Sequence, residues 1–287
     1  MPRTRLRQSC HTSGATLRLP QPSSGSFMTP TELNAFVDEL ATASGEAILP
    51  FFRTDLAAED KSGGGVFDPV TEADKAAERV MRTLIAERFP DHGIVGEEYG
   101  VERRDAASVW VLDPIDGTKA FVSGLPLWGT LIGLLDGGRA KLGMMHQPFI
   151  GERFVGDGHS ASYRGPAGER ALRTRRCASL AEATLSTTSP QLIPRDRIDA
   201  YRRVEEKVRL ARYGYDCYAY CMVAAGHIDL VIEAGLKPYD IVALVPIVEG
   251  AGGVVTTWTG GRPEEGGAIV ASGDPRLHEE ALRLLQG

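Results

Sequence analysis

Two aspartates, three positions apart, follow directly on an apolar run. The stretch from Trp110 to Phe121 reads WVLDPIDGTKAF, with carboxylates at Asp113 and Asp116. The apolar run is typical of a buried strand, and a carboxylate at its end is costly to bury unless it is paired or binds a metal ion. The pattern therefore indicates that a cation meets these two side chains.

Further carboxylates lie at the ends of other predicted elements, at Asp68, Asp74, Glu97, Glu98 and Asp240, the last at the start of a helix. Carboxylates that converge without arginine partners repel one another and raise each other's pKa values, and a divalent cation removes this repulsion. Hard oxygen ligands suit Mg²⁺, which keeps water and substrate phosphate among its ligands. The acidic clusters therefore favour Mg²⁺-dependent phosphoryl chemistry.

Gly117 and Thr118 supply a place for an anion. If a helix begins just after Asp116, its free N–H groups and positive dipole end form an anion site. Thr118, with one carboxylate partner, could then orient a metal-bound water for in-line attack on a phosphoryl group. The alternative for Thr118 is a simple capping hydroxyl, since threonine is a common helix cap.

Other chemistries have no support in the sequence. No H-E-x-x-H, G-x-S-x-G or phosphate-binding P-loop pattern occurs, and the histidines are scattered. The four cysteines include no C-x-x-C pair, which argues against a disulfide framework or zinc site and fits a reducing compartment. No apolar stretch reaches the roughly 18 residues of a membrane span, so we expect a cytoplasmic protein without membrane contacts.

The first 31 residues differ from the rest. They contain four of the 32 basic residues and no acid before Glu32. We expect residues 1–28 to be a disordered tail or an extension upstream of a natural start at Met28, with a transit-like leader as a third alternative. The remaining chain has 28 basic residues against 38 acidic ones, a poor balance for binding nucleic acid.

Residues 29–287 predict alternating elements in one domain of two sub-domains, with a boundary near 157–185. A capping box at Thr29–Glu32 starts one helix, and Thr71 starts a second that stops near Phe89. Strands are predicted at 93–95, at 109–112, in long runs over 127–155, and near 183–188, 208–212, 228–233, 253–258 and 268–271. Helices are predicted at 195–207, 216–225, 240–250 and 275–286. This order indicates an α+β or layered α/β fold.

These motifs resemble those of the inositol monophosphatase family. The resemblance rests on D-P-I-D-G-T at 113–118, G-E-E at 96–98 and D-P-V-T-E-A-D at 68–74, and it spans about residues 30–286. It implies an α-β-α-β-α sandwich and a lithium-sensitive phosphatase that uses two or three Mg²⁺ ions per site. It also implies a homodimer and a small-molecule phosphate monoester as substrate.

The resemblance further implies a ligand set for the metal ions. Glu97, Asp113 and the carbonyl oxygen of Ile115 would bind the first Mg²⁺. Asp113, Asp116 and Asp240 would bind the second, and Glu97 with water molecules would hold a third.

The resemblance assigns the remaining catalytic roles to residues near these ligands. Thr118 and Asp74, with Glu97 nearby, would activate the attacking water. The N–H groups of Gly117 and Thr118 would receive the phosphate.

Two segments depart from the usual family pattern and resemble the branch that acts on histidinol phosphate. They are D-C-Y-A-Y at 216–220 and E-A-G-L-K-P-Y-D at 233–240. A carboxylate at Asp216, facing Glu233 across the pocket, would favour a cationic substrate. The alternative is that Asp216 only caps the helix at 217–225.

The sequence thus predicts hydrolysis of L-histidinol phosphate to L-histidinol and phosphate in histidine biosynthesis. One alternative keeps the chemistry but uses inositol 1-phosphate or another sugar or nucleotide monophosphate. Another is a catalytically silent binding protein built on the same fold.

Overall fold

The computed structural model describes residues 29–54, 59–60 and 69–287. The predicted tail at 1–28, most of the Gly-rich loop at 61–69, and Asp68 lie outside the described residues. Within the described part of the chain, no helix is long and apolar enough to cross a membrane.

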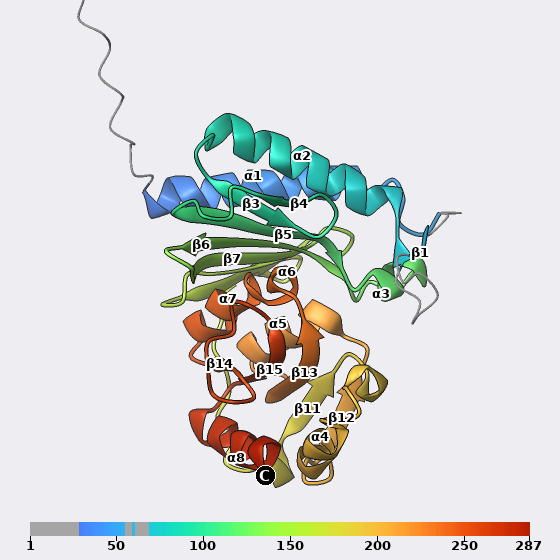
Figure 1. Ribbon diagram of the computed structural model, residues 1–287, viewed down its shortest axis with the longest axis vertical. Coiled ribbons are helices and arrows are strands. Elements are labelled where there is room, and N and C mark those ends of the chain that lie inside the picture. Colours follow the sequence, from blue (N-terminus) through green and yellow to red (C-terminus); the bar gives the residue numbers. More distant parts are fainter. Residues whose placement is uncertain (1–28, 55–58, 61–68) are drawn as a thin grey trace, which may run out of the picture.

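An eight-stranded sheet and a five-stranded sheet organise the described residues (Figure 1). The larger sheet is antiparallel except where β3 and β5 run parallel, and it has the order β10 (Gly168–Ala171), β9 (Ala161–Gly165), β8 (Glu152–Gly156), β7 (Arg139–Gln147), β6 (Gly129–Asp136), β5 (Ser108–Asp116), β3 (Gly93–Gly96), β4 (Gly100–Glu102). The smaller sheet is mixed, with the order β12 (Leu210–Tyr213), β11 (Thr184–Thr187), β13 (Leu230–Leu236), β15 (Gly267–Ser272), β14 (Val254–Thr257). A short pair, β1 (Glu59–Asp60) and β2 (Pro69–Val70), lies beside them.

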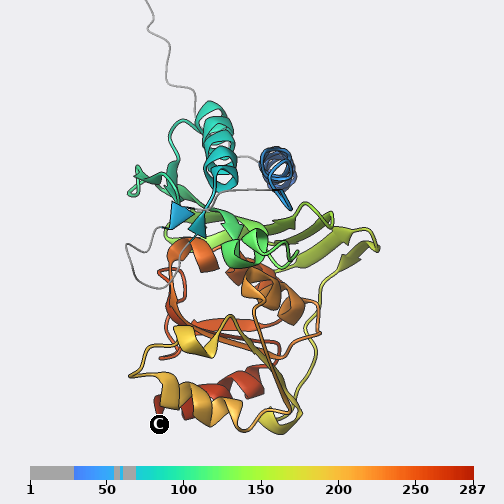
Figure 2. The same cartoon turned by 90° about the vertical axis from the view of Figure 1, so that its right-hand side faces the viewer.

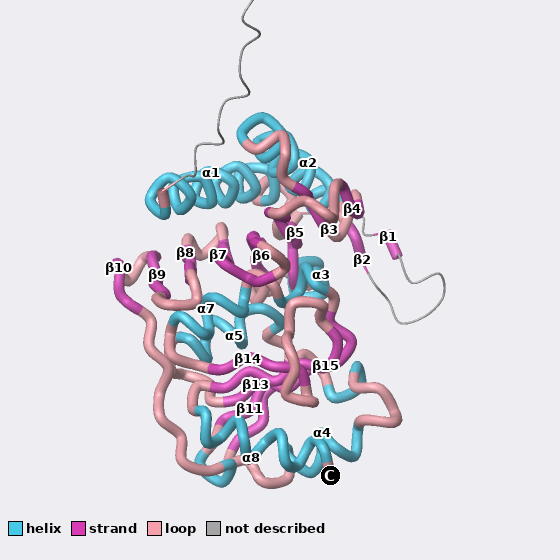
Figure 3. Tube along the Cα trace, turned by 60° about the vertical axis from the view of Figure 1, so that its left-hand side comes forward, coloured by secondary structure: helices cyan, strands magenta, loops and turns pink. Residues whose placement is uncertain are grey.

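Helices cover the outer face of each sheet and fill the space between the sheets (Figures 2 and 3). The outer layers are α1 (Pro30–Ile48) with α2 (Glu72–Arg88) on the larger sheet, and α4 (Ile198–Glu205) with α8 (Pro275–Gln286) on the smaller. Between the sheets lie α5 (Asp216–Ala224), α6 (Pro238–Ile241) and α7 (Leu244–Gly250). The predicted α-β-α-β-α sandwich is confirmed.

Local signals in the sequence account for the starts of the first two helices. Thr29 and Thr71 each form the capping box that opens α1 and α2. In α1, the apolar stripe that includes Phe36 and Leu40 is buried against the larger sheet, as its helical spacing predicts.

The prediction of one continuous helix at 240–250 is wrong. It is broken into α6 and α7, because Pro246 has no N–H to donate to Val242 and a new helical turn starts at Leu244. The strands β9 and β10, for which no strand was predicted, lie within the segment predicted to hold a sub-domain boundary. The sub-domain boundary at 157–185 stays a prediction.

Glycines on three neighbouring strands let α6 and α7 approach the larger sheet closely. A Cβ atom at Gly133 would lie 2.8 Å from Cγ1 of Val242, and one at Gly143 would overlap the carbonyl group of Ala243. A Cβ atom at Gly156 would likewise overlap the backbone of Pro246 and Ile247. The backbone that carries Asp240 is therefore seated directly on the sheet.

We expect Gly143→Ala to destabilise the protein by about 1–3 kcal/mol, because its methyl group forces the α6–α7 backbone away from β7. Chemical denaturation would measure the loss. The matched control is Ser162→Ala on an exposed position of β9, which should change stability by less than about 0.5 kcal/mol. A Gly143→Ala variant as stable as the control would contradict the close packing.

Candidate functional site

Two acidic residues come together where β3 and β5 end. The strands are parallel, with Gly96 beside Leu112, and the N–H of Glu97 donates to the carbonyl oxygen of Leu112 over 3.2 Å. Parallel strands end at the same edge of a sheet, so Glu97 and Asp113 emerge as neighbours. A hydrogen bond joins their side chains.

A buried carboxylate on α2 fixes the segment that holds Glu97. Both oxygens of Glu78 accept backbone N–H groups, from Glu98 over 2.7 Å and from Tyr99 over 3.1 Å. A Cβ atom at Gly96 would collide with the Glu78 carboxylate. The glycine of the G-E-E motif is therefore required by close packing.

Asp113, Asp116 and Asp240 form one carboxylate cluster. Each offers an oxygen, and the three oxygens lie within 4.8 Å of one another. Burial raises the pKa of Asp113 well above its usual range, and the charges of Glu97, Asp116 and Asp240 raise it further. Three mutually repelling hard donors fit a divalent cation such as Mg²⁺.

An irregularity in β5 lets its two aspartates reach the same cluster. The pairing of β5 with β6 shifts between Asp113 and Asp116. There the carbonyl oxygen of Pro114 accepts the hydroxyl of Thr130 over 2.8 Å instead of a ladder N–H. Without this break, residues three apart on a strand would point to opposite faces.

Asp240 joins the cluster from α6 in the second half of the chain. Its carboxylate accepts the N–H of Lys237 over 2.6 Å. Burial raises its pKa to about 7, and the charges of Glu97 and Asp216 add to the increase.

The predicted helix start after Asp116 is confirmed as α3 (Thr118–Val122). Gly117 precedes it with φ of 88°, a left-handed conformation that favours glycine. The Thr118 hydroxyl donates to the carbonyl oxygen of Ile115 over 3.0 Å. The roles of this carbonyl as a metal ligand and of the N–H groups as a phosphate site stay predictions.

Asp74 is buried at the start of α2. One of its oxygens accepts both the N–H and the hydroxyl of Thr71, over 2.8 and 2.6 Å. Burial raises its pKa to about 6, and the nearby charge of Glu97 contributes. Its joint action with Thr118 on a water molecule stays a prediction.

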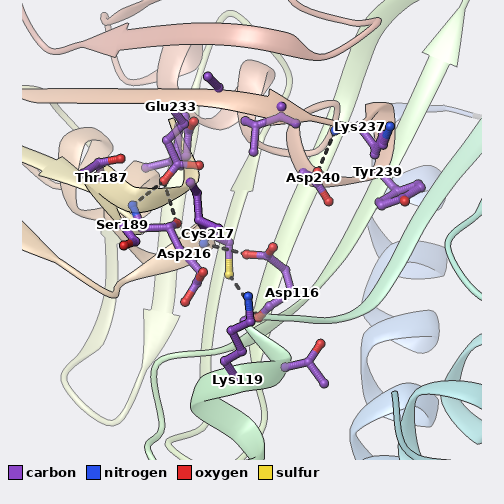
Figure 4. A pocket seen from close by; sticks show the side chains of 18 of the residues that line it. Asp116, Lys119, Thr187, Ser189, Asp216, Cys217, Glu233, Lys237, Tyr239 and Asp240 are labelled. Carbon is purple, nitrogen blue, oxygen red and sulfur yellow. Dashed lines mark hydrogen bonds between the residues drawn. The ribbon is translucent and has the colours of Figure 1, made fainter. Parts of the chain in front are cut away.

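A pocket of about 430 Å³ opens over the cluster. One side of it carries a group that we call the acidic wall, made of Asp216, Glu233 and Thr188 (Figure 4). The N–H and hydroxyl of Thr188 both donate to Glu233, over 2.9 and 2.7 Å, and Thr188 also hydrogen-bonds Asp216. Asp216 and Glu233 therefore lie beside each other, which corrects the prediction that they face each other across the pocket.

The structure does not support a purely capping role for Asp216. Tyr215 is the residue before α5, and it is the carboxylate of Asp116 that accepts the free N–H of Cys217 over 2.6 Å. Asp216 adopts φ of 44°, an uncommon conformation for a residue other than glycine. Burial raises the pKa of Asp216, while the hydrogen bond from Thr188 and the charge of Lys119 lower it.

Several pocket residues were not predicted as site residues, among them Thr188, Lys119 and Lys237. Thr188 ends the strand predicted at 183–188, Lys119 directly follows the D-P-I-D-G-T motif, and Lys237 lies within the E-A-G-L-K-P-Y-D motif. The G-T-K string already placed Lys119 near the cluster. Nothing in the sequence paired Thr188 with residues of two distant segments.

Comparisons with known proteins agree with the fold and identify a family. Residues 30–287 match the model of the family described as the inositol monophosphatase family. The chain is 43% identical to the bifunctional phosphatase IMPL2, chloroplastic, of Arabidopsis thaliana, covering 98% of this chain and 84% of that protein. It is 36% identical to the histidinol-phosphatase of Mycobacterium tuberculosis, covering 76% and 84%. Among solved structures, an inositol monophosphatase from Zymomonas mobilis matches with a TM-score of 0.81 and 40% identity, covering 91% and 100%.

We expect the metal-free protein to lose stability as the pH rises from 4.5 to about 7. Burial raises the pKa of Glu233 from 4.5 to about 7, so the folded state binds more protons than the unfolded state in this window. In EDTA, the free energy of unfolding of the wild type should fall by about 1–3 kcal/mol more than that of Glu233→Gln over that range. Thermal melts at a series of pH values would measure the difference. Equal slopes for the two proteins would contradict the buried, charge-crowded position of Glu233.

Proposed function

Because the chain belongs to the inositol monophosphatase family, we propose that it is a Mg²⁺-dependent phosphatase that hydrolyses L-histidinol phosphate to L-histidinol and phosphate. The family membership makes the chain a metal-dependent phosphatase. The choice of histidinol phosphate, and with it a place in histidine biosynthesis, is our proposal.

The choice of histidinol phosphate as the substrate rests on the acidic wall. Glu233 is buried and Asp216 is half-buried beside the cluster, and desolvation raises the pKa of both carboxyl groups. Inositol offers only hydroxyl groups, whereas histidinol offers an ammonium and an imidazole group. A cationic group at the wall would be attracted by these carboxylates and would favour their ionised form.

The relatives give the proposal a second support. The M. tuberculosis protein is named a histidinol-phosphatase, and the A. thaliana protein a bifunctional phosphatase. The Z. mobilis protein is described as an inositol monophosphatase, so inositol 1-phosphate is the competing substrate.

The metal site proposed here uses the residues at the edge of the larger sheet. Glu97, Asp113, Asp116, Asp240 and the Ile115 carbonyl would hold two or three Mg²⁺ ions. Bound there, Mg²⁺ would polarise the phosphoryl oxygens and lower the pKa of a bound water.

The protein groups around this site orient the reactants. Thr118 and Asp74 would direct the attacking water, and the N–H groups of Gly117 and Thr118 would fix the phosphate. Asp216 and Glu233 would hold the amine-bearing end. A homodimer, a cytoplasmic location and inhibition by lithium also stay predictions.

The decisive experiment measures kcat/KM for histidinol phosphate and inositol 1-phosphate side by side, with Mg²⁺ and with EDTA. We expect histidinol phosphate to be hydrolysed faster, and both activities to vanish in EDTA. Faster turnover of inositol 1-phosphate would refute the substrate assignment but leave the phosphatase assignment intact.

Asp113→Asn should lower kcat for every substrate by roughly 100-fold or more, because it removes a carboxylate from the metal cluster. The same change should stabilise the protein in EDTA, since it removes one of several repelling buried charges. Thermal melts with and without Mg²⁺ would check this, and the gain in stability from Mg²⁺ should shrink in the variant. Retained activity together with an undiminished Mg²⁺ effect would refute the metal role of Asp113.

Asp216→Asn should reduce kcat/KM for histidinol phosphate by about 10-fold or more and for inositol 1-phosphate by less than about 3-fold. Asparagine keeps the shape of the side chain and tolerates the left-handed backbone, so only the charge is removed. Equal losses on both substrates would show that Asp216 is structural.

A further inference from the structure

Two lysines line the pocket, and they belong to different parts of it. Lys237 stands beside the carboxylate cluster, where its charge lowers the pKa of Asp240 and its N–H binds the same carboxylate. Lys119 lies in the first turn of α3, and its charge lowers the pKa of Asp216 in the acidic wall. Among the residues that the structure describes, Lys119 forms no direct ion pair.

The Lys119 side chain reaches the junction between the cluster and the acidic wall. Figure 4 shows it extending from α3 toward Asp116 and Asp216. These two aspartates lie close together: Oδ2 of Asp216 is 3.3 Å from the position of a Cβ atom on Gly117, the residue after Asp116. The ammonium group of Lys119 therefore lies where the phosphoryl group of a substrate, held at the cluster, would meet its alcohol part.

With the phosphoryl group at the cluster and the alcohol in the rest of the pocket, as the proposed phosphatase activity requires, the ester oxygen would lie at this junction. In hydrolysis, the water oxygen bonds to phosphorus while the bond from phosphorus to the ester oxygen breaks. The electron pair stays on the ester oxygen, which takes up the proton that the attacking water releases through solvent. An alkyl ester leaves as a strongly basic alkoxide, so a fixed positive charge beside this oxygen lowers the barrier.

We propose that Lys119 is a catalytic residue that donates a hydrogen bond from its ammonium group to the ester oxygen as the alcohol leaves. The proposal rests on the phosphatase activity and not on histidinol phosphate as the substrate. Lys119 stays protonated throughout, and its contribution grows with the basicity of the leaving group.

The test compares an alkyl with an aryl phosphate, because 4-nitrophenolate leaves as a stabilised anion. The alkyl substrate is whichever of histidinol phosphate, inositol 1-phosphate and glycerol 2-phosphate the wild type hydrolyses fastest. We expect Lys119→Met to reduce kcat/KM for it by about 10- to 100-fold, and for 4-nitrophenyl phosphate by less than about 3-fold. Lys119→Arg, which keeps the charge, should stay within about 5-fold of wild type on both.

Lys237→Met is the matched comparison, since it removes the other lysine of the same pocket. It should lower both activities in similar proportion through its effect on Asp240. Lys119 is exposed, so its variants should melt as the wild type does. An equal loss on alkyl and aryl esters, no loss on either, or the same alkyl-selective loss in Lys237→Met would overturn the proposal. The outcome of this test does not depend on whether the wild type hydrolyses histidinol phosphate or inositol 1-phosphate faster.

Discussion

The mutual repulsion of closely spaced carboxylates, of which Asp113 is fully buried, is the constraint on which this structure depends. Asp113, Asp116 and Asp240 bring oxygens within 4.8 Å of one another, and Glu97 adds a further acid. Such a cluster opposes folding unless a cation compensates it or the rest of the protein forces it together. The scaffold therefore has to supply the packing energy that holds these groups in place.

Close contacts to the backbone hold the carboxylates of the cluster in place. Gly96 lets Glu78 fasten the turn after β3, and Gly143 with its neighbours seats α6 and α7 directly on the larger sheet. Each contact excludes even a methyl group, so the two halves of the chain meet in one arrangement. Strain is concentrated at the site as well, because Asp216 adopts a left-handed conformation next to Gly117.

Under the proposed function, the pocket separates reaction from recognition by the place of its carboxylates. The cluster at the end of β5 suits metal ions, whereas Asp216 and Glu233 share Thr188 at a distinct wall. Lys119 stands between them. Under this proposal, changes at the wall would alter the substrate without disturbing the cluster, so that one phosphatase scaffold could accept different alcohols.

The sequence by itself determined the reaction chemistry and most of the fold. Capping boxes at Thr29 and Thr71 and the apolar strand before Asp113 are local signals, so they could be read without tertiary contacts. The interruption before α7 and the strands β9 and β10 were missed, because proline and glycine weaken the local pattern there. Only the tertiary structure decided that Asp216 and Glu233 lie side by side through Thr188. Those residues come from three separate segments, and the packing of α5 against β11 and β13 alone sets their distance.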